Sequence, residues 1–185
     1  LQARSYPTET PSAVRRRRLA AHQVHLRSQN CRGLKSDAQL RELAFSFTAS
    51  RVFACGLQET WRAGQELFAI DDVNFILSGP DKQVGRGTKG IGFALSNAAF
   101  KIWEKSGSKM VVSEDNRAMG IRLVMEDTHG KDVGLFLVCC YAPIGVAPQS
   151  QWDNFFTGWD LTRDTAKAGG IVVTCGDFNS SMVTT

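Results

Sequence analysis

Short apolar runs that end at or just before a polar residue constrain the fold of this chain more than any other feature. Residues 52–57, 133–141 and 171–175 have the length and the β-branched or aromatic content of buried strands. None approaches the roughly 20 consecutive apolar residues that a membrane helix needs. We therefore expect a fold built on sheets, with no membrane partner and with polar groups at the strand ends.

Further strands are predicted from shorter patterns. Val24 and Leu26 alternate with polar residues up to Asn30, and strands are also expected at 75–77, 91–95, 109–113 and 119–125. The breaks between the later strands are rich in Gly, Asp, Asn and Ser, which favours antiparallel meanders over helical crossovers.

Two segments have helical spacing. Ser36 and Asp37 can cap a helix whose apolar positions are Leu40, Leu43, Ala44 and Phe47. A second helix is expected after residue 141, with Trp152, Phe155, Phe156 and Trp159 on one face, and it ends at Gly169 and Gly170. We interpret this aromatic stripe as core rather than as a base-stacking platform. Strands interrupted by two helices predict a mixed α/β sandwich with its site at the strand mouths.

The N-terminal segment has a different composition. Residues 1–21 contain Pro7, Pro11 and the arginine run 15–18 without apolar periodicity, so we expect a disordered basic leader before one folded domain at 22–185. The chain carries 22 Lys and Arg against 18 Asp and Glu. Since the run supplies four of those positive charges, the remainder is neutral and supports a polyanionic partner only weakly.

The cysteine pattern bears on metals and compartment. The chain has five cysteines without CxxC spacing and three histidines, so no Cys/His zinc site is expected. We predict buried thiols in a reducing, intracellular compartment.

Five polar residues, each at the end of a predicted strand or just beyond one, are the candidate site: Asn30, Glu59, Tyr141, Asp177 and Asn179. Taken singly, a carboxylate at a strand end is more often a turn or cap residue. Together they could converge. Magnesium takes carboxylate, amide and water oxygens, and phosphoryl chemistry needs such a cation to neutralise charge on the phosphate.

The order of five segments carries a family resemblance. They are NCRGL at 30–34, LQETW at 57–61, KGIGFALS at 89–96, YAP at 141–143 and GDFN at 176–179. Together they resemble the endonuclease/exonuclease/phosphatase superfamily, and most closely the endonuclease domains of LINE-type retrotransposons and the craniofacial development protein 2-like proteins. The resemblance to apurinic/apyrimidinic endonucleases is more distant. The resemblance to the superfamily implies a four-layered α/β sandwich of two mixed sheets flanked by helices, incomplete at the C-terminus.

The resemblance also implies roles for the five residues. Glu59 would be the principal Mg²⁺ ligand, assisted by Asn30, with Mn²⁺ as a substitute metal. Asp177 would orient or deprotonate the attacking water, Asn179 would hold the scissile phosphate, and the Tyr141 phenol would lie against the phosphate or leaving group. The implied activity is nicking of DNA by a monomeric domain, for which a nuclear location would be suitable.

Three basic residues are candidates for nucleic-acid contacts. Arg117 precedes a predicted strand and could clamp a phosphate through its guanidinium. Arg86 and Lys89 lie in a G-x-G-x-x-G segment at 85–90. Because a strand rather than a helix follows, we predict no dinucleotide site there but a loop that touches the nucleic-acid backbone.

One expected motif is missing. Members of the superfamily close with further strands and a Ser-Asp-His segment, whereas the last histidine here is His129, before Tyr141. We therefore expect a C-terminally truncated domain. Two alternatives remain open: a phosphatase of the same superfamily acting on inositol phosphates or lipids, and a non-catalytic retroelement remnant retained as a nucleic-acid-binding or interaction module.

Overall fold

The computed structural model describes residues 24–82, 89–127, 129–164 and 170–179. The strands there are β1 (Leu26–Asn30), β2 (Ala54–Gln58), β3 (Gln65–Ile70), β4 (Val73–Ser78), β5 (Ile91–Ser96), β6 (Met110–Val112), β7 (Ala118–Glu126), β8 (Asp132–Tyr141) and β9 (Gly170–Asp177). The helices are α2 (Asp37–Ala49), α3 (Asn97–Lys105) and α4 (Gln149–Asp164). The predicted leader, residues 1–21, lies outside the described residues.

The strands form two mixed sheets. The first has the order β1-β2-β5-β4-β3 and the second β6-β7-β8-β9. Strands β1 and β2 are parallel, as are β8 and β9, and all other neighbouring pairs are antiparallel. A parallel pair at one edge of each sheet brings the C-terminal ends of β1, β2, β8 and β9 to the same side of the molecule.

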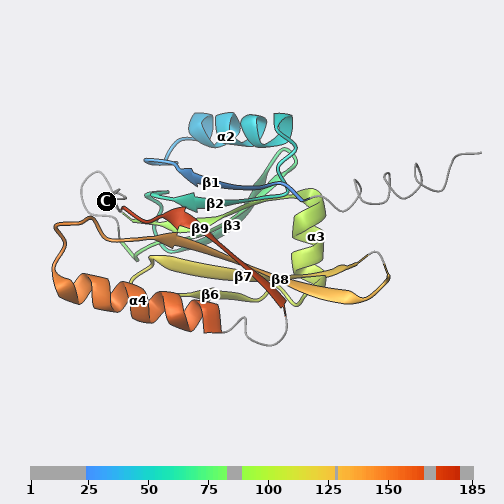
Figure 1. The fold of residues 1–185 in the computed structure, drawn as a ribbon. Helices are drawn as coiled ribbons and strands as arrows, with labels where there is room; N and C mark the ends of the chain where they lie inside the picture. The colour runs from blue at the N-terminus through green and yellow to red at the C-terminus, as the bar shows by residue number, and fades with distance from the viewer. Residues whose placement is uncertain (1–23, 83–88, 128, 165–169, 180–185) are drawn as a thin grey trace, which may run out of the picture.

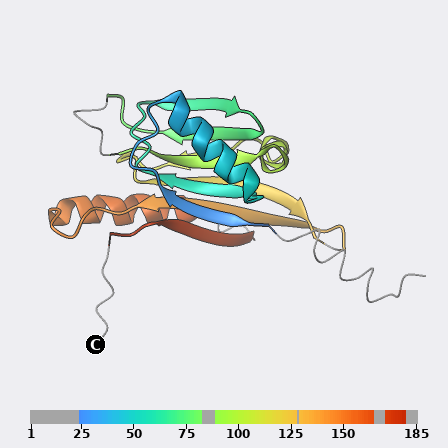
Figure 2. The same cartoon turned by 90° about the horizontal axis from the view of Figure 1, so that it is seen from above.

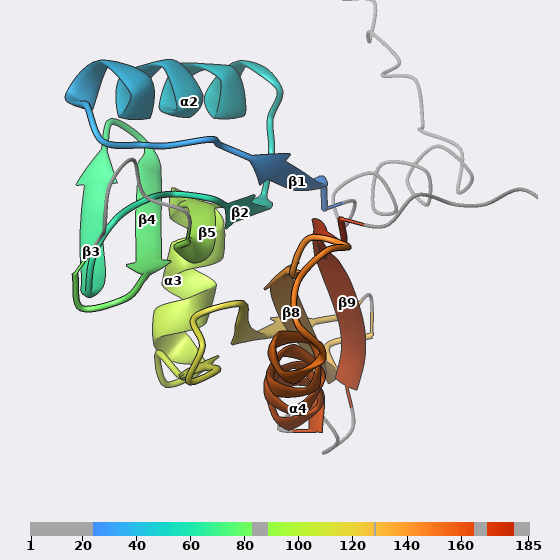
Figure 3. The same cartoon turned by 90° about the vertical axis from the view of Figure 1, so that its left-hand side faces the viewer.

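The two sheets pack face to face between helices. Helix α2 covers the outer face of the first sheet and α4 that of the second (Figures 1 and 3). Seen from above, α2 runs across the strands of the first sheet (Figure 2). The main core between the sheets includes Phe93, Leu95, Ile121 and Leu137, which are at most 3% exposed. The predicted four-layered α/β sandwich of two mixed sheets is confirmed.

Helix α2 follows from its local sequence. The Ser36 hydroxyl accepts the Gln39 N–H at 3.3 Å, and the Gln39 side-chain oxygen accepts the Ser36 N–H at 3.1 Å, which makes a capping box. Its four predicted apolar positions are the buried ones. Among the described residues, no helix is both long and apolar enough to cross a membrane.

Helix α3 was not expected. The sequence predicted a turn-rich antiparallel connection between β5 and β6, and this prediction was wrong. The Ser96 hydroxyl caps the helix by accepting the Ala99 N–H at 3.2 Å, while Ala99 and Trp103 are buried against the sheets. A local cap and two apolar side chains one turn apart therefore outweighed the nearby turn residues. Strand β3 was also missed. It is an edge strand in which the apolar Leu67 and Ala69 are exposed, so its sequence lacks the alternation of polar and apolar residues that identifies a half-buried strand.

The aromatic stripe of α4 is mostly core. Phe155 is 1% exposed and packs with the half-buried Trp152 and Trp159 against β7 and β8, but Phe156 is 46% exposed.

All five cysteines are free thiols, and Cys55, Cys139 and Cys140 are buried. Burial raises the pKa of the Cys55 and Cys140 thiols to about 12. Both thiols are therefore protonated at neutral pH, and they are unreactive because the thiolate is the nucleophilic form of cysteine.

Candidate active site

The candidate site lies where the C-terminal ends of β1, β2, β8 and β9 meet, at the left of Figure 1. Asn30, Tyr141 and Asp177 are the last residues of β1, β8 and β9, and Glu59 directly follows β2. Because each parallel pair places its carboxyl ends together, the four side chains gather across the joint between the two sheets.

The Asn30 amide bridges two carboxylates. Its Nδ2 donates to Oε1 of Glu59 at 2.7 Å and to Oδ2 of Asp177 at 2.8 Å. An amide nitrogen has two N–H donors, so both are used. A neutral donor between two anionic groups reduces their mutual repulsion without neutralising them, which leaves the site strongly attractive to a cation.

The amide oxygen of Asn30 has a different partner. Oδ1 accepts the backbone N–H of Arg32 at 3.1 Å. This arrangement fixes the orientation of the amide and makes Asn30 a positioning residue for the two carboxylates. Its role as a direct metal ligand stays a prediction.

Tyr141 lies beside the carboxylates. It is the register partner of Asp177 on the parallel pair β8–β9 and is 9% exposed. Its pKa is raised above the ordinary value by burial first, then by the negative charge of Glu59 and a hydrogen bond from the phenol to that carboxylate, with a smaller contribution from Asp177. The Arg117 guanidinium opposes the shift. The phenol is therefore a proton donor throughout the neutral range.

Asn179 ties the end of β9 to the segment after β8. Its Nδ2 donates to the Ala142 carbonyl at 2.7 Å, and its backbone N–H donates to Oδ1 of Asp177 at 3.0 Å. The Ala142 N–H in turn donates to the Asp177 carbonyl at 2.8 Å. The second N–H of the Asn179 side chain can serve a phosphate oxygen.

Left-handed backbone occurs at two of the candidate residues. Glu59 has φ +53° and Asn179 has φ +46°. Asn tolerates this region, whereas Glu adopts it at a cost of about 1–3 kcal/mol. At Glu59 the conformation turns the carboxylate toward Asn30 directly after β2, so the strain coincides with the position of the site.

Arg117 contacts Tyr141 rather than a carboxylate. Its Nη1 donates to the Tyr141 carbonyl at 3.2 Å, and its guanidinium carbon lies 5.2 Å from the centre of the phenol ring. Its own carbonyl accepts the Tyr141 N–H at 2.8 Å. Arg117 therefore holds Tyr141 in place, and the phosphate clamp stays a prediction.

Of the two loop residues expected to touch nucleic acid, Arg86 lies outside the described residues. Lys89 is half-buried, and its carbonyl accepts the Trp61 N–H at 2.9 Å. This bond places the end of the loop beside the segment that carries Glu59. The predicted nucleic-acid contacts of both side chains stay predictions.

Two supporting residues were missed in the sequence. Gln58 is 1% exposed, and its side chain donates to the Cys139 sulfur at 2.9 Å and accepts from the Ser28 hydroxyl at 3.3 Å, so it joins both sheets beneath the site. Asn116 accepts the hydroxyl of Ser78 at 3.0 Å and so links the turn before Arg117 to β4. For Gln58, the available signal in the sequence was a polar residue at the end of an apolar run, where it needs a hydrogen-bond partner once buried.

The donor set suits a hard cation. In the described part of the chain, no group of three or more His, Cys, Asp or Glu side chains is arranged to hold a metal. Glu59 and Asp177 supply two carboxylates, and each accepts a hydrogen bond from the Asn30 amide. Magnesium is commonly bound by one or two carboxylates plus water and phosphate oxygens, so these residues fit it.

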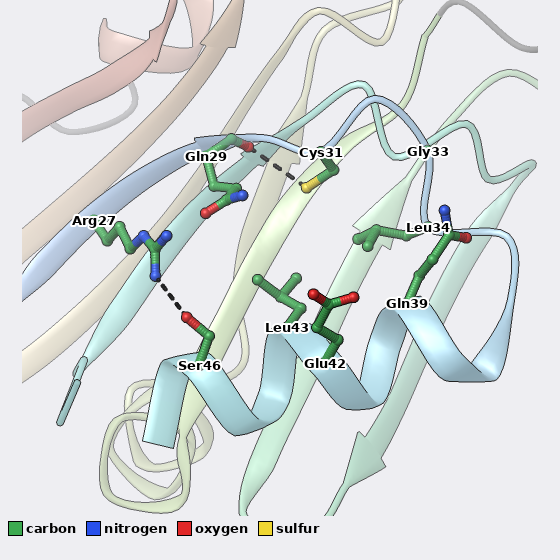
Figure 4. A pocket seen from close by; sticks show the side chains of 9 residues that line it. All are labelled: Arg27, Gln29, Cys31, Gly33, Leu34, Gln39, Glu42, Leu43 and Ser46. Carbon is green, nitrogen blue, oxygen red and sulfur yellow. Dashed lines mark hydrogen bonds between the residues drawn. The ribbon is translucent and has the colours of Figure 1, made fainter. Parts of the chain in front are cut away.

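A separate pocket lies on the other side of β1. It encloses about 290 Å³ between β1 and α2, and Arg27, Cys31, Gln39 and Glu42 are among its lining residues (Figure 4). Arg27 Nη1 donates to the Ser46 hydroxyl across it at 3.3 Å. Asn30 does not line it, because alternate residues of a strand face opposite sides.

Comparison with known proteins supports the fold. No protein-family model matches the chain, and curated proteins give no match either. Among solved structures, the catalytic domain of Xenopus laevis APE2 matches with a TM-score of 0.55 at 16% identity, over 83% of this chain and 58% of that one.

Two further structures match with lower TM-scores. The human Nocturnin catalytic domain gives 0.44 at 14% identity, over 85% of this chain and 64% of that one. ANGEL2, described as a 2′,3′-cyclic phosphatase, gives 0.44 at 12% identity, over 78% and 44%. The chain thus spans less than two thirds of each of these structures. It has the DNase-like fold of the APE2 catalytic domain, a two-sheet α/β sandwich flanked by helices.

Proposed function

We propose that this chain is a magnesium-dependent phosphodiester hydrolase of the endonuclease/exonuclease/phosphatase superfamily, and specifically an endonuclease that nicks DNA. The observation that carries the proposal is the Asn30 amide, which holds Glu59 at 2.7 Å and Asp177 at 2.8 Å. The LINE-type sequence segments favour a retroelement origin, and a DNA substrate would suit a nuclear location.

The two carboxylates serve different purposes in this proposal. Glu59 would hold the divalent cation, which supplies positive charge to a phosphate oxygen when bound. Asp177 lies at the same amide and, as a carboxylate, can accept a proton from the attacking water. Asn30 holds one oxygen of each carboxylate through its amide nitrogen.

Neutral donors complete the site. Tyr141 keeps its proton at neutral pH because its pKa is raised, so its phenol can donate to a phosphate oxygen or to the departing oxygen. Asn179 has one side-chain N–H beyond the bond to Ala142 and can donate it to another phosphate oxygen. Donors of this kind stabilise a developing anion without repelling the substrate.

The test is nicking of supercoiled plasmid by the 185-residue chain. We expect nicked circles with Mg²⁺ or Mn²⁺, none with EDTA, and a rate at least about 10²-fold lower in Glu59→Gln and Asp177→Asn. Glu104→Gln on the exposed face of α3 is the matched control and should nick like the wild type.

Other results would replace the proposal. Release of phosphate from an inositol phosphate without plasmid nicking, lost in the same two variants, would assign a phosphatase. A chain that is folded by circular dichroism and binds DNA, but neither nicks plasmid nor releases phosphate with either metal, would be a non-catalytic binding module.

A further inference from the structure

Two thiols lie next to each other in the core between the sheets. Cys139 on β8 and Cys175 on β9 are register partners in the parallel pair at the edge of the second sheet (Figure 3). Their side chains are close enough to form a hydrogen bond with each other. Neighbouring β-strands lie about 4.7–4.9 Å apart, inside the range of about 4.4–6.8 Å between Cα atoms that a disulfide requires. The strand geometry therefore permits a bond between the two sulfurs.

Gly56 on β2, in the opposite sheet, provides the space in which the sulfurs meet. An added Cβ at Gly56 would lie 2.4 Å from the Cys175 sulfur and 3.0 Å from the Cys139 sulfur. Both sulfurs therefore occupy the volume that a side chain would take at this position. The other three thiols pack on the outer faces of the two sheets, on the sides of α2 and α4. Cys139 and Cys175 are thus the thiols that share the layer between the sheets.

A small oxidant can reach the pair at Cys175. This side chain is half-buried and lines an apolar pocket of about 290 Å³ between the two sheets, together with Leu26, Phe93 and Val173. Hydrogen peroxide is only slightly larger than water, which occupies about 30 Å³ in the liquid, so the pocket has room for it. Cys139 is fully buried. An oxidant therefore meets the Cys175 sulfur first.

Gln58 connects the pair to the candidate site. Its side-chain nitrogen donates to the Cys139 sulfur at 2.9 Å, and the Cys139 thiol donates to the Leu57 carbonyl at 3.5 Å. Leu57 and Gln58 directly precede Glu59, whose backbone is already strained at φ +53°. A disulfide would remove the thiol proton and draw the Cys139 sulfur toward Cys175. The buried Gln58 amide would then lose its acceptor, and the segment that carries Glu59 would be displaced.

The pair also lies below two other candidate residues. Tyr141 and Asp177 are register partners, each two residues beyond one of the cysteines on the same strand. Because alternate residues of a strand point to the same face, the two pairs lie on one face of the second sheet. A covalent bond between the sulfurs would fix the distance between β8 and β9 directly beside the site.

We propose that Cys139 and Cys175 form a reversible disulfide on exposure to a peroxide, and that this bond lowers the activity of the candidate site. The effect on activity rests on the proposed function, whereas formation of the bond does not. A reducing thiol restores both cysteines by thiol–disulfide exchange. The pair is therefore a redox-sensitive modification site built into the core between the sheets.

The oxidation takes two steps. First, the Cys175 sulfur attacks one oxygen of hydrogen peroxide, the O–O bond breaks, and the departing oxygen takes the thiol proton and leaves as water, which gives a sulfenic acid. Second, the Cys139 sulfur attacks the sulfenic sulfur, the S–O bond breaks, and a second water leaves with the Cys139 proton. Two thiols thus lose two electrons in total, and one peroxide is reduced to two waters.

The first test maps the bond by mass spectrometry. The reduced chain is treated with hydrogen peroxide, and its remaining thiols are alkylated before digestion with trypsin. A link is then sought between peptide 132–163, which contains Cys139 and Cys140, and peptide 168–185, which contains Cys175. We expect this link in the wild type and in the matched control Cys140→Ala, and we expect none in Cys139→Ala.

The second test measures plasmid nicking, and Mn²⁺ binding by electron paramagnetic resonance, in the reduced, oxidised and re-reduced chain. Oxidation should lower the wild-type nicking rate by about tenfold, since a buried hydrogen bond beside the site is lost, and dithiothreitol should restore the rate. Mn²⁺ binding should weaken and recover in parallel. Cys175→Ala keeps the contact between Gln58 and Cys139, so it should nick like the wild type and should not respond to peroxide.

Three outcomes would decide the matter differently. Absence of the link in the oxidised wild type, or its persistence in Cys139→Ala, would overturn the disulfide. A disulfide that leaves both nicking and Mn²⁺ binding unchanged would disprove its connection to the site. A chain that forms the disulfide and reversibly loses Mn²⁺ binding, but never nicks plasmid when reduced, supports the inference and contradicts the proposed function instead.

Discussion

The side-chain amide of Asn30 lies 2.8 Å from the carboxylate of Asp177, although 147 positions separate the two residues in the chain. Asn30 ends the edge strand of the first sheet, and Asp177 ends β9 of the second. The site therefore spans both sheets, and its geometry depends on how the sheets pack against each other. Substitutions of site residues should lower the nicking rate, whereas substitutions in the supporting loops should lower the free energy of unfolding.

Replacing Asn30 with Ala should lower the nicking rate by about 10²-fold while the fold is retained. The substitution removes two charge-assisted hydrogen bonds, each worth about 1.5–3 kcal/mol, and leaves Glu59 and Asp177 without the shared donor that aligns them. Plasmid nicking and circular dichroism measure the two effects. Asn154→Ala on the exposed side of α4 is the control, and equal rates in the two variants would refute the positioning role of Asn30.

The phenol of Tyr141 should ionise above the ordinary tyrosine pKa of about 10. Burial and the Glu59 carboxylate raise its pKa in the folded state, so the folded chain binds this proton more tightly than the unfolded chain. The stability due to this proton is full below the ordinary pKa and is lost as the pH rises toward the raised one.

Absorbance titration near 295 nm can isolate this phenol, since the chain has two tyrosines, Tyr6 and Tyr141. The difference between wild type and Tyr141→Phe gives the Tyr141 curve. An ionisation of Tyr141 at or below the ordinary tyrosine value of about 10 would contradict the described environment.

Replacing Arg117 with Gln should raise the pKa of Tyr141 further and slow nicking by about tenfold. The guanidinium is the group that opposes the shift, and it also holds the ring and carbonyl of Tyr141. Arg117→Lys should bring the Tyr141 pKa part of the way back toward the wild-type value, because the positive charge is kept. It should not restore the contact of the planar guanidinium with the phenol ring. An increase in KM with an unchanged Tyr141 titration would instead assign Arg117 to the phosphate clamp.

Replacing Gly90 with Ala should destabilise the chain by about 3 kcal/mol or more, as strain of about 1–3 kcal/mol is joined by a steric clash. Gly90 has φ +108°, and an added Cβ would lie 2.3 Å from the Thr60 hydroxyl oxygen and 3.1 Å from the Trp61 nitrogen. Gly107→Ala is a suitable control, because Gly107 has φ +90° but nothing within 4 Å of an added Cβ.

Urea unfolding of both glycine variants separates backbone strain from steric clash. Gly107→Ala should cost about 1–2 kcal/mol, the usual penalty for left-handed backbone. Equal losses in the two variants would mean that contact with the segment after Glu59 contributes nothing.

Local patterns in the sequence determined most of the elements. The capping residues and apolar spacing of α2 and the short apolar runs of β2, β5, β8 and β9 act over a few neighbouring residues, so they can be recognised without knowledge of the partners. The same locality explains the failures. Helix α3 gains its stability from Ala99 and Trp103 against both sheets, and β3 from pairing with β4, and neither contact is visible in a short window.

The sequence alone also identified the polar residues at the strand ends, because a polar group after a buried strand stands out against the apolar run. Only the tertiary structure decided which of them touch. Strand pairing set Tyr141 opposite Asp177, the packing of two sheets brought Asn30 to both carboxylates, and the turn before β7 directed Arg117 to Tyr141. These relationships depend on register and on contacts between distant segments, which are global properties of the folded chain.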